Sequence, residues 1–319
     1  MKAFLAKLLV VLLGIAVGLA AAEIGVRIYY GTLPKVPEYK MNQRGYRDVE
    51  HALAKPAGTT RIAFVGDSYT FGAMVGFDRI FSTRTGDMLR RLYPGRQIEV
   101  LNFGVRGANI VKDLNRFQAS GLKFDPDVVV FGFVLNDFTN PEATHRFDRS
   151  FQHEEKRYRF LAPLEKFSAL ARFIDWAAFQ LFGKEKKAHL AWLNSTFLPA
   201  HNPYFAKSRR ALDELTAIIG KRHGIVLFFP YLAAKAEDHL PYYREGKALV
   251  QHACLKNGCE FVEVWPLLKH KRHSAWWASP LDHHPNAEAH EIIARAVAGI
   301  IRRKGLLDAA PAPAAMERP

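Results

Sequence analysis

The chain has 319 residues, of which 49% are hydrophobic and 12% aromatic, and a formal net charge of +14 at pH 7. This composition is sufficient for one enlarged α/β domain and excludes a largely disordered chain. The basic residues are spread along the sequence without a DNA- or RNA-binding motif. We therefore expect no nucleic-acid partner and attribute the charge to an anionic membrane surface or an acidic polymer.

The N-terminal stretch is the most apolar part of the chain. Lys2 and Lys7 precede an uninterrupted apolar run at residues 8–22, which ends in three alanines that fit a signal-peptide cleavage site. The run is short for a spanning helix, but residues 3–5 lengthen it. Apolar and aromatic residues continue to Tyr30, so we favour an uncleaved signal anchor over residues 1–30. The rest of the chain is then extracytoplasmic, or secreted if the signal is cleaved.

Residues 31–60 are rich in turn-forming residues and predict a linker or lead-in segment that wraps onto the domain. The domain itself is predicted at residues 61–306. Apolar runs and helical periodicity alternate through it, which predicts a doubly wound parallel sheet with helices on both faces. The predicted strands are residues 62–65, 97–103, 127–133, 225–229 and 261–264, and the predicted helices are residues 81–92, 110–122, 205–222 and 286–301.

The alternation breaks at residues 138–201, which we interpret as an insertion with a helical segment at residues 164–182. Aromatic and charged residues are frequent there. The insertion either packs over the functional site and selects the substrate or forms a surface appendage. Residues 307–319, rich in alanine and proline, predict a disordered tail.

The two cysteines, Cys254 and Cys259, are separated by four residues. They form either a disulfide across a helix-to-strand turn or two ordinary small residues, and the sequence favours neither. Two cysteines are too few for a zinc site, and no His, Cys and Glu cluster has the spacing of metal ligands. We predict no metal and no cofactor.

The strand at residues 62–65 stops at a Gly-Asp pair and delivers Ser68 to a strand end, where α/β folds place reactive groups. A serine hydroxyl needs a neighbouring base to act as a nucleophile. His284 is the candidate base, and Asp282 in the same loop is the candidate partner that orients it. Asp67 and Asp137 are expected to order their turns by accepting backbone hydrogen bonds. We expect no chemical role for His290.

Four segments occur in a fixed order: GDS at residues 66–68, LNFGVRGAN at 101–109, FVLNDF at 133–138 and LDHHPN at 281–286. Together they resemble the four blocks of the SGNH hydrolases, also called GDSL-type esterases and lipases, over residues 41–305. The resemblance implies a flavodoxin-like three-layer α/β/α fold. It also implies Ser68 as nucleophile, His284 as base and Asp282 as its orienting acid.

The same resemblance implies an oxyanion hole made by the backbone amides of Ser68 and Gly104 and the side-chain amide of Asn136. The sequence departs from the common family pattern at Val134, where many members have glycine. Residues 42–47, NQRGYR, resemble the segment that precedes the serine block in membrane-anchored members, and their role is open.

These observations lead to a membrane-anchored serine ester hydrolase as the leading hypothesis. By analogy with other extracytoplasmic members, an acetyl or other short acyl group on a glycan is the first substrate class. The alternatives are a lipid esterase, motivated by aromatic residues such as Trp176, Phe179, Trp192 and Trp276, and an O-acyltransferase that uses the same site. A catalytically silent scaffold in envelope polysaccharide assembly is the alternative from another class. Nothing in the sequence determines the oligomeric state.

Overall fold

The computed structural model describes residues 2–139, 159–182, 204–230, 232, 241–280 and 282–308. The chain forms two compact units, one comprising Met1–Pro34 and Glu142–Trp192 and the other comprising Lys35–Pro141 and Leu193–Pro319. The predicted insertion is therefore described only in part, and Trp192 and most of the predicted C-terminal tail lie outside the described residues.

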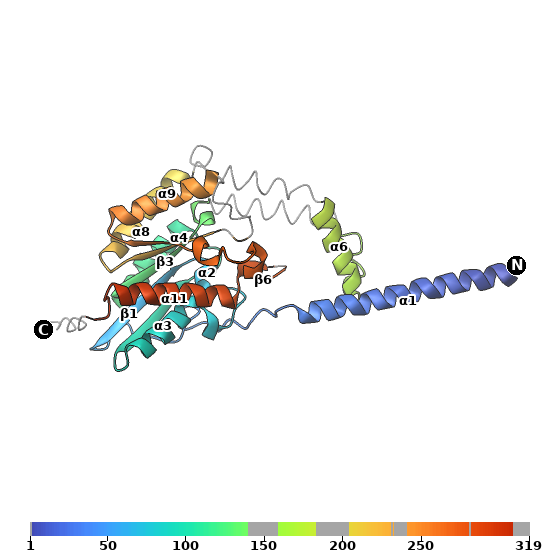
Figure 1. Cartoon of the computed structure of the whole chain (residues 1–319), viewed down its shortest axis with the longest axis horizontal. Coiled ribbons are helices and arrows are strands. Elements are labelled where there is room, and N and C mark those ends of the chain that lie inside the picture. The colour runs from blue at the N-terminus through green and yellow to red at the C-terminus, as the bar shows by residue number, and fades with distance from the viewer. Residues whose placement is uncertain are drawn as a thin grey trace. The chain divides into compact units, whose positions relative to one another are not determined.

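The second unit contains a five-stranded sheet in which every strand pairs with its neighbours in parallel (Figure 1). The central strands β1 and β3 are buried along their whole length because both faces of the sheet are covered, and their apolar runs at residues 62–65 and 128–134 fit this position. This arrangement confirms the predicted doubly wound parallel sheet. In spatial order the strands are β2 (Gln97–Gly104), β1 (Thr59–Gly66), β3 (Val128–Val134), β4 (Ile225–Phe229) and β5 (Glu260–Glu263).

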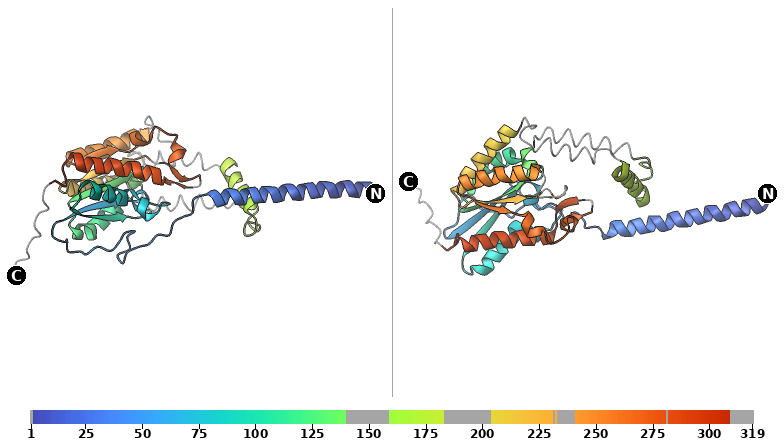
Figure 2. Two further views of the ribbon diagram at one scale, coloured as in Figure 1. Left: turned by 60° about the horizontal axis from the view of Figure 1, so that its bottom comes forward. Right: turned by 45° about the horizontal axis from the view of Figure 1, so that its top comes forward.

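Helices cover both faces of this sheet (Figures 1 and 2). One face carries α3 (Phe81–Leu92) and α11 (Ala287–Arg303), and the other carries α4 (Ile110–Ala119), α8 (Phe205–Gly220) and α9 (Pro241–Lys256). The shorter described elements are α2 (Ser68–Phe71), η1 (Phe77–Arg79), η2 (Gly121–Phe124), η3 (Leu135–Phe138), α10 (Trp265–Leu268), η5 (His273–Trp276), β6 (Trp277–Ser279) and β7 (Asp282–Pro285).

Capping sets several helix ends. Asn109 and Asn286 accept backbone N–H groups at the starts of α4 and α11. No side chain of its own segment caps α3, and the imidazole of His290 instead accepts the Phe81 amide at 3.2 Å. The helix predicted at residues 110–122 ends at Ala119, because the chain tightens into the 3-10 turn η2.

The segment before β1 covers the open edge of β2. Asp48 accepts the backbone amide of Asn102 at 2.7 Å, and the Tyr46 ring packs edge-on against Phe103 with centroids 4.9 Å apart. A sheet edge left bare exposes unpaired backbone groups. The lead-in segment therefore belongs to the fold of the second unit.

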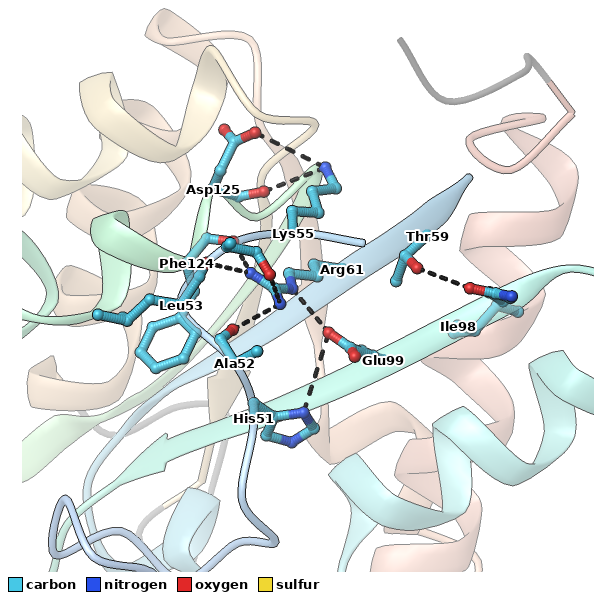
Figure 3. A network of polar contacts seen from close by, with 12 residues as sticks. His51, Ala52, Leu53, Lys55, Thr59, Arg61, Ile98, Glu99, Phe124 and Asp125 are labelled. Atoms are coloured by element: carbon cyan, nitrogen blue, oxygen red, sulfur yellow. Dashed lines mark hydrogen bonds and ion pairs between the residues drawn. The ribbon is translucent and has the colours of Figure 1, made fainter. Parts of the chain in front are cut away.

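A buried guanidinium fixes the end of the same segment. Arg61 is 0% exposed at the start of β1 and donates to the carboxylate of Glu99 at 2.7 Å (Figure 3). Its remaining donors reach the carbonyls of Ala52, Leu53, Ala54 and Phe124. Because these acceptors lie in the lead-in segment, in β2 and in η2, Arg61 ties the lead-in segment to the amino end of the sheet.

Two helices of the first unit are described, α1 (Lys2–Thr32) and α6 (Ala169–Phe182). Residues Ala6–Thr32 of α1 have a mean hydropathy of 2.4 in their most apolar window, none of which is buried. By length and composition α1 can cross a membrane. The helix predicted at residues 164–182 begins only at Ala169, and the described residues before it form turns.

Cys254 and Cys259 are free thiols, both buried. The two side chains are hydrogen bonded to each other, and this bond, with burial, raises the pKa of the Cys254 thiol. Of the two arrangements open from the sequence, the structure shows the pair without a disulfide.

Candidate active site

The carboxyl ends of three neighbouring strands bring three of the sequence blocks together. Gly66, at the end of β1, is in register with Gly104 of β2 and Gly132 of β3. Ser68 follows β1 and begins α2, and Asn136 follows β3 in η3. In parallel α/β sheets ligands bind at this edge, next to the strands where the connections diverge.

The fourth block reaches the same edge from the C-terminal part of the chain. The Oγ of Ser68 lies 2.9 Å from Nε2 of His284, and Nδ1 of His284 lies 2.6 Å from Oδ1 of Asp282. The backbone amide of His284 donates to the same Asp282 oxygen at 2.9 Å. The structure thus brings together all three residues predicted as nucleophile, base and orienting acid.

Asp282 is suited to face an imidazolium. Burial raises its pKa, but the hydrogen bonds from the His284 side chain and amide outweigh burial, so the net pKa lies below its ordinary value. Asp282 is therefore ionised at neutral pH. A carboxylate in this position selects the tautomer with the proton on Nδ1 and leaves Nε2 as the acceptor for Ser68.

Aromatic rings pack against His284 and against its neighbour His283. The Tyr69 ring meets the imidazole edge-on with centroids 5.6 Å apart. The preceding residue, His283, packs on Trp277 with centroids 4.0 Å apart, and the Trp277 indole donates to the Leu232 carbonyl at 2.9 Å. His283 is half-buried and takes no part in the Ser68 contact.

The side-chain amide of Asn136 points toward the nucleophile turn. Its Nδ2 lies 3.5 Å from Oδ2 of Asp67, the residue before Ser68, while its buried Oδ1 has no partner among the described residues. Asp67 also accepts the Tyr69 amide at 2.9 Å, which orders the turn as expected. A weakly engaged carboxamide beside the nucleophile is free to turn toward a developing oxyanion.

Gly104 ends β2 next to the backbone of α2. Its backbone N–H donates to Oδ1 of Asn102 at 2.9 Å, and its role as an oxyanion donor stays a prediction. The need for glycine has another cause: a Cβ here would lie 2.2 Å from the Phe71 amide nitrogen. The position is glycine because β2 touches the backbone of α2, and the sequence could not distinguish this close packing from a donor role.

Gly107 is the glycine of this loop that the sequence interpretation passed over. It has a φ of 67°, is exposed, and its amide has no acceptor within the part of the chain that the structure describes. The signal for it was present in the second glycine of the segment NFGVRG. Gly107 is therefore a second candidate, beside Gly104, for the oxyanion donor of this loop.

The GDSL-like lipase/acylhydrolase family matches residues 64–292 of the chain. This range contains all four sequence blocks and ends within α11. The chain belongs to this family. It is a carboxylic ester hydrolase, as the sequence blocks predicted.

The hydrolase is also similar to solved structures, but at low sequence identity. An α/β hydrolase from the metagenome of Lake Arreo is 18% identical, with a TM-score of 0.47 over 81% of this chain and 100% of that one. An acetylxylan esterase from Geobacillus stearothermophilus is 18% identical, with a TM-score of 0.46 over 78% and 95%. A lipase/acylhydrolase from Enterococcus faecalis is 13% identical, with a TM-score of 0.48 over 77% and 96%. No curated protein matches the chain.

Arg47 of the lead-in segment fixes the nucleophile loop of the hydrolase, a role the sequence did not reveal. The residue is 1% exposed and donates to the carbonyls of Phe71, Gly72 and Val75, at 3.3, 2.5 and 2.6 Å. Its guanidinium also lies over the Tyr39 ring, 4.6 Å from the centroid. The carbonyls belong to the last residue of α2 and to the turn that follows it, so Arg47 holds the end of the helix that begins with Ser68.

Three buried carboxyl groups lie close enough to interact electrostatically around the site: Asp67, Asp113 and Asp137. Burial raises the pKa of Asp67 to about 6, although the Tyr69 amide and His284 act in the opposite direction. Burial and the charge of Asp67 raise the pKa of Asp113 and Asp137 well above the ordinary value. Both shifts favour the protonated, neutral form of Asp113 and Asp137.

His290 is buried on α11, and burial lowers its pKa to about 3. The neutral ring caps α3 through Phe81 and stacks on the Phe81 ring. Within the described residues, no group of three or more His, Cys, Asp or Glu side chains has the arrangement to hold a metal ion.

Proposed function

We propose that the protein hydrolyses carboxylic esters through a covalent acyl intermediate on Ser68. The observation that carries this proposal is the chain of contacts from Ser68 Oγ to His284 Nε2 at 2.9 Å and from His284 Nδ1 to Asp282 at 2.6 Å. The distances permit proton transfer without rearrangement.

In the first step Ser68 Oγ attacks the acyl carbon while His284 Nε2 takes its proton. Asp282 stabilises the imidazolium that forms. The carbonyl oxygen becomes an oxyanion, stabilised by the Ser68 amide, the Asn136 carboxamide and an amide of the loop after β2. His284 then returns its proton to the leaving alcohol, the C–O bond of the ester breaks, and the acyl group remains on Ser68.

In the second step water takes the place of the alcohol. His284 accepts a proton from water as its oxygen attacks the acyl carbon, and returns this proton to Ser68 Oγ as the bond to serine breaks. The products are the carboxylic acid and free enzyme. If a sugar hydroxyl replaces water, the same intermediate gives an acyltransferase.

For the substrate, we propose a short acyl ester, acetyl first, on a glycan. The half-buried pair of His283 and Trp277 beside His284 offers two aromatic rings, tilted by 42° to each other and with polar edges, against which a sugar ring can pack. The net charge of +14 favours an acidic polymer over a neutral one. We further propose that α1 is a signal anchor and that the hydrolase unit lies on the extracytoplasmic side.

The test of the nucleophile is labelling of the full-length protein in detergent by a fluorophosphonate probe. Wild type is expected to react covalently, whereas Ser68→Ala and His284→Ala do not. Asn136→Ala is expected to keep its thermal stability and lose about 10²–10³-fold in kcat on p-nitrophenyl acetate, the effect of removing one oxyanion donor. A folded wild-type protein without labelling would overturn the proposal in favour of a silent scaffold.

The substrate class is tested with p-nitrophenyl esters of increasing acyl length and with O-acetylated oligosaccharides. We expect the highest kcat/KM for acetyl and release of free acetate from the glycan. Activity that rises steadily with acyl length would indicate a lipid esterase. Recovery of the acetyl group on an added sugar acceptor, rather than as acetate, would indicate a transferase.

A further inference from the structure

Residues 159–182 present an unusual number of exposed apolar side chains. Seven large apolar residues on this short segment are between 38% and 78% exposed: Phe160, Leu164, Phe167, Ile174, Trp176, Leu181 and Phe182. Single exposed apolar residues are normal on soluble proteins, but a dense set marks an interaction surface.

The two described acidic residues of this segment form hydrogen bonds and ion pairs within the segment itself. Glu165 pairs with Arg159, and Asp175 is 3% exposed because both of its oxygens accept the Leu161 amide. Arg172 is exposed on α6, and Lys166 is exposed on the turn before it. The outer surface of the segment is therefore apolar and basic, which matches a lipid surface with anionic headgroups.

The segment is tied to α1 by a carboxylate. Glu23 of α1 accepts the Ser168 hydroxyl at 2.7 Å and the backbone amides of Ala169 and Leu170, both at 2.9 Å. These donors are the N-terminus of α6, where unpaired N–H groups favour negative charge. In return, Arg27 of α1 donates to the Phe167 carbonyl at 2.7 Å.

The position of Glu23 along α1 indicates how deep the contact between α1 and α6 lies relative to the membrane. The residue follows directly on the apolar run at residues 8–22, and Arg27, Tyr29 and Tyr30 come after it. About 20 apolar residues cross the hydrocarbon core, and aromatic and basic residues gather at its boundary. With α1 in a bilayer, Glu23 lies at the boundary, where three hydrogen-bond donors offset the cost of burying a carboxylate.

We infer that residues 159–182 form a second membrane-contacting element, which binds the bilayer surface at the end of α1 and is held there by Glu23. This inference depends on the proposed membrane location of α1 and is independent of the chemistry at Ser68. The apolar side chains of α6 then enter the boundary between headgroups and acyl chains, while Lys166 and Arg172 face the phosphates.

The experiment uses full-length protein in vesicles of phosphatidylcholine and phosphatidylglycerol. Phe167→Cys and Leu181→Cys are labelled with an environment-sensitive dye, and Lys256→Cys, exposed at the end of α9, is the control. The native thiols are buried, so the unsubstituted protein is expected to take up no dye. Dye at positions 167 and 181 should shift to the blue and be quenched by lipids that carry a shallow nitroxide, whereas dye at position 256 should respond only to aqueous iodide.

The role of Glu23 is tested by adding Glu23→Ala to the Leu181→Cys protein. The variant is expected to stay in the membrane pellet after carbonate extraction but to lose most of the nitroxide quenching. Glu38→Ala, at an exposed acid of the lead-in segment outside α1, should leave quenching unchanged. Hydrolysis of p-nitrophenyl acetate in the same vesicles reports the catalytic site separately.

Three results would overturn the inference. Iodide quenching at position 181 without nitroxide quenching would show that the element faces water. A blue shift that neither quencher affects would show that protein, such as the hydrolase unit, covers it. Release of the full-length protein by carbonate would show that α1 does not span the membrane, and the inference depends on that location.

Discussion

Asp113 is the least satisfied of the buried carboxyl groups near Ser68. It is 1% exposed, and neither of its oxygens has a hydrogen-bond partner among the described residues. Burial and the neighbouring Asp67 raise its pKa well above the ordinary value. A group of this kind is tolerated as a neutral acid and costs stability when it ionises.

The pH dependence of stability follows from this shift. The unfolded chain loses the Asp113 proton near the ordinary pKa of about 3.9, while the folded protein retains it. The contribution of Asp113 to stability is therefore complete below that pKa and is lost as the pH rises toward the folded value. Asp113→Asn cannot lose a proton, so we expect it to raise the free energy of unfolding by about 1–3 kcal/mol at pH 8 and by less at pH 5.

The measurement is urea unfolding of wild type and Asp113→Asn at several pH values. Asp87→Asn, on the surface of α3 with its side chain 36% exposed, serves as the control. An Asp113→Asn protein that is less stable than wild type at pH 8 would show that the carboxylate has a partner and is ionised in the fold.

At the scale of residues, the sequence predicted side chains of the candidate active site that belong to short motifs and meet at one edge of the sheet. Ser68 and Asn136 follow the carboxyl ends of β1 and β3, so the topology of the sheet brings them near each other, whereas Asp282 and His284 reach the same edge from β7. The hydrogen bond from the Gly104 amide to Asn102, two residues away, was not predicted because it depends on side-chain orientation. No sequence pattern reports that orientation.

At the scale of elements, the lead-in segment is part of the active-site scaffold. Arg47 donates to three carbonyls at and just beyond the end of α2, and Tyr39 accepts the Met74 amide through its hydroxyl at 2.9 Å. The turn it fixes contains Gly72 and Met74 in left-handed conformation, with φ of 76° and 68°. Such a turn persists only where its surroundings hold it.

Replacement of Arg47 tests this connection. Arg47→Met leaves the carbonyls of Phe71, Gly72 and Val75 without their donors, so we expect a loss of about 2–4 kcal/mol in stability. Below the melting temperature, kcat on p-nitrophenyl acetate should fall more than KM rises, because the Ser68 turn becomes mobile while the substrate contacts remain.

Arg44→Met is the matched control, since Arg44 is exposed in the same segment and only covers the Phe124 ring. Both variants are compared with wild type by thermal unfolding and steady-state kinetics. Equal behaviour of the two variants would show that Arg47 does not position the nucleophile turn.

Whether a segment forms a helix or a strand was predictable where its own pattern of apolar residues decides this. The apolar strands β1 and β3 and the amphipathic helix α11 follow directly from the sequence. Contacts between distant segments were not predictable. A buried arginine at position 47 resembles a surface residue in sequence, and Glu23 meets its partners 145 to 147 positions later in the chain.

At the scale of the whole molecule, the division into two units predicts what can be removed. The buried apolar cluster of the hydrolase unit runs from Ile62 to Leu307 and draws nothing from α1. A protein of residues 35–319 should therefore fold, with a thermal midpoint close to that of the full chain and kcat/KM on p-nitrophenyl acetate within about twofold of it.

A protein of residues 51–319 is the contrasting variant, because it also lacks the buried residues Tyr46 and Arg47 and the carboxylate of Asp48. We expect it to melt at a lower temperature and to lose activity. Circular dichroism and ester hydrolysis measure both. Loss of folding in the 35–319 protein would place α1 inside the hydrolase fold, and full activity of the 51–319 protein would remove the lead-in segment from it.

The covered edge of β2 has a consequence for self-association. With Asp48 bonded to the Asn102 amide and Tyr46 against Phe103, the lead-in segment occupies the carboxyl end of the β2 edge, where a strand from another copy would otherwise pair. Proteolytic nicking before β1 would free this part of the edge. We therefore expect clipped molecules to associate with one another more readily than intact ones, through strand pairing at β2.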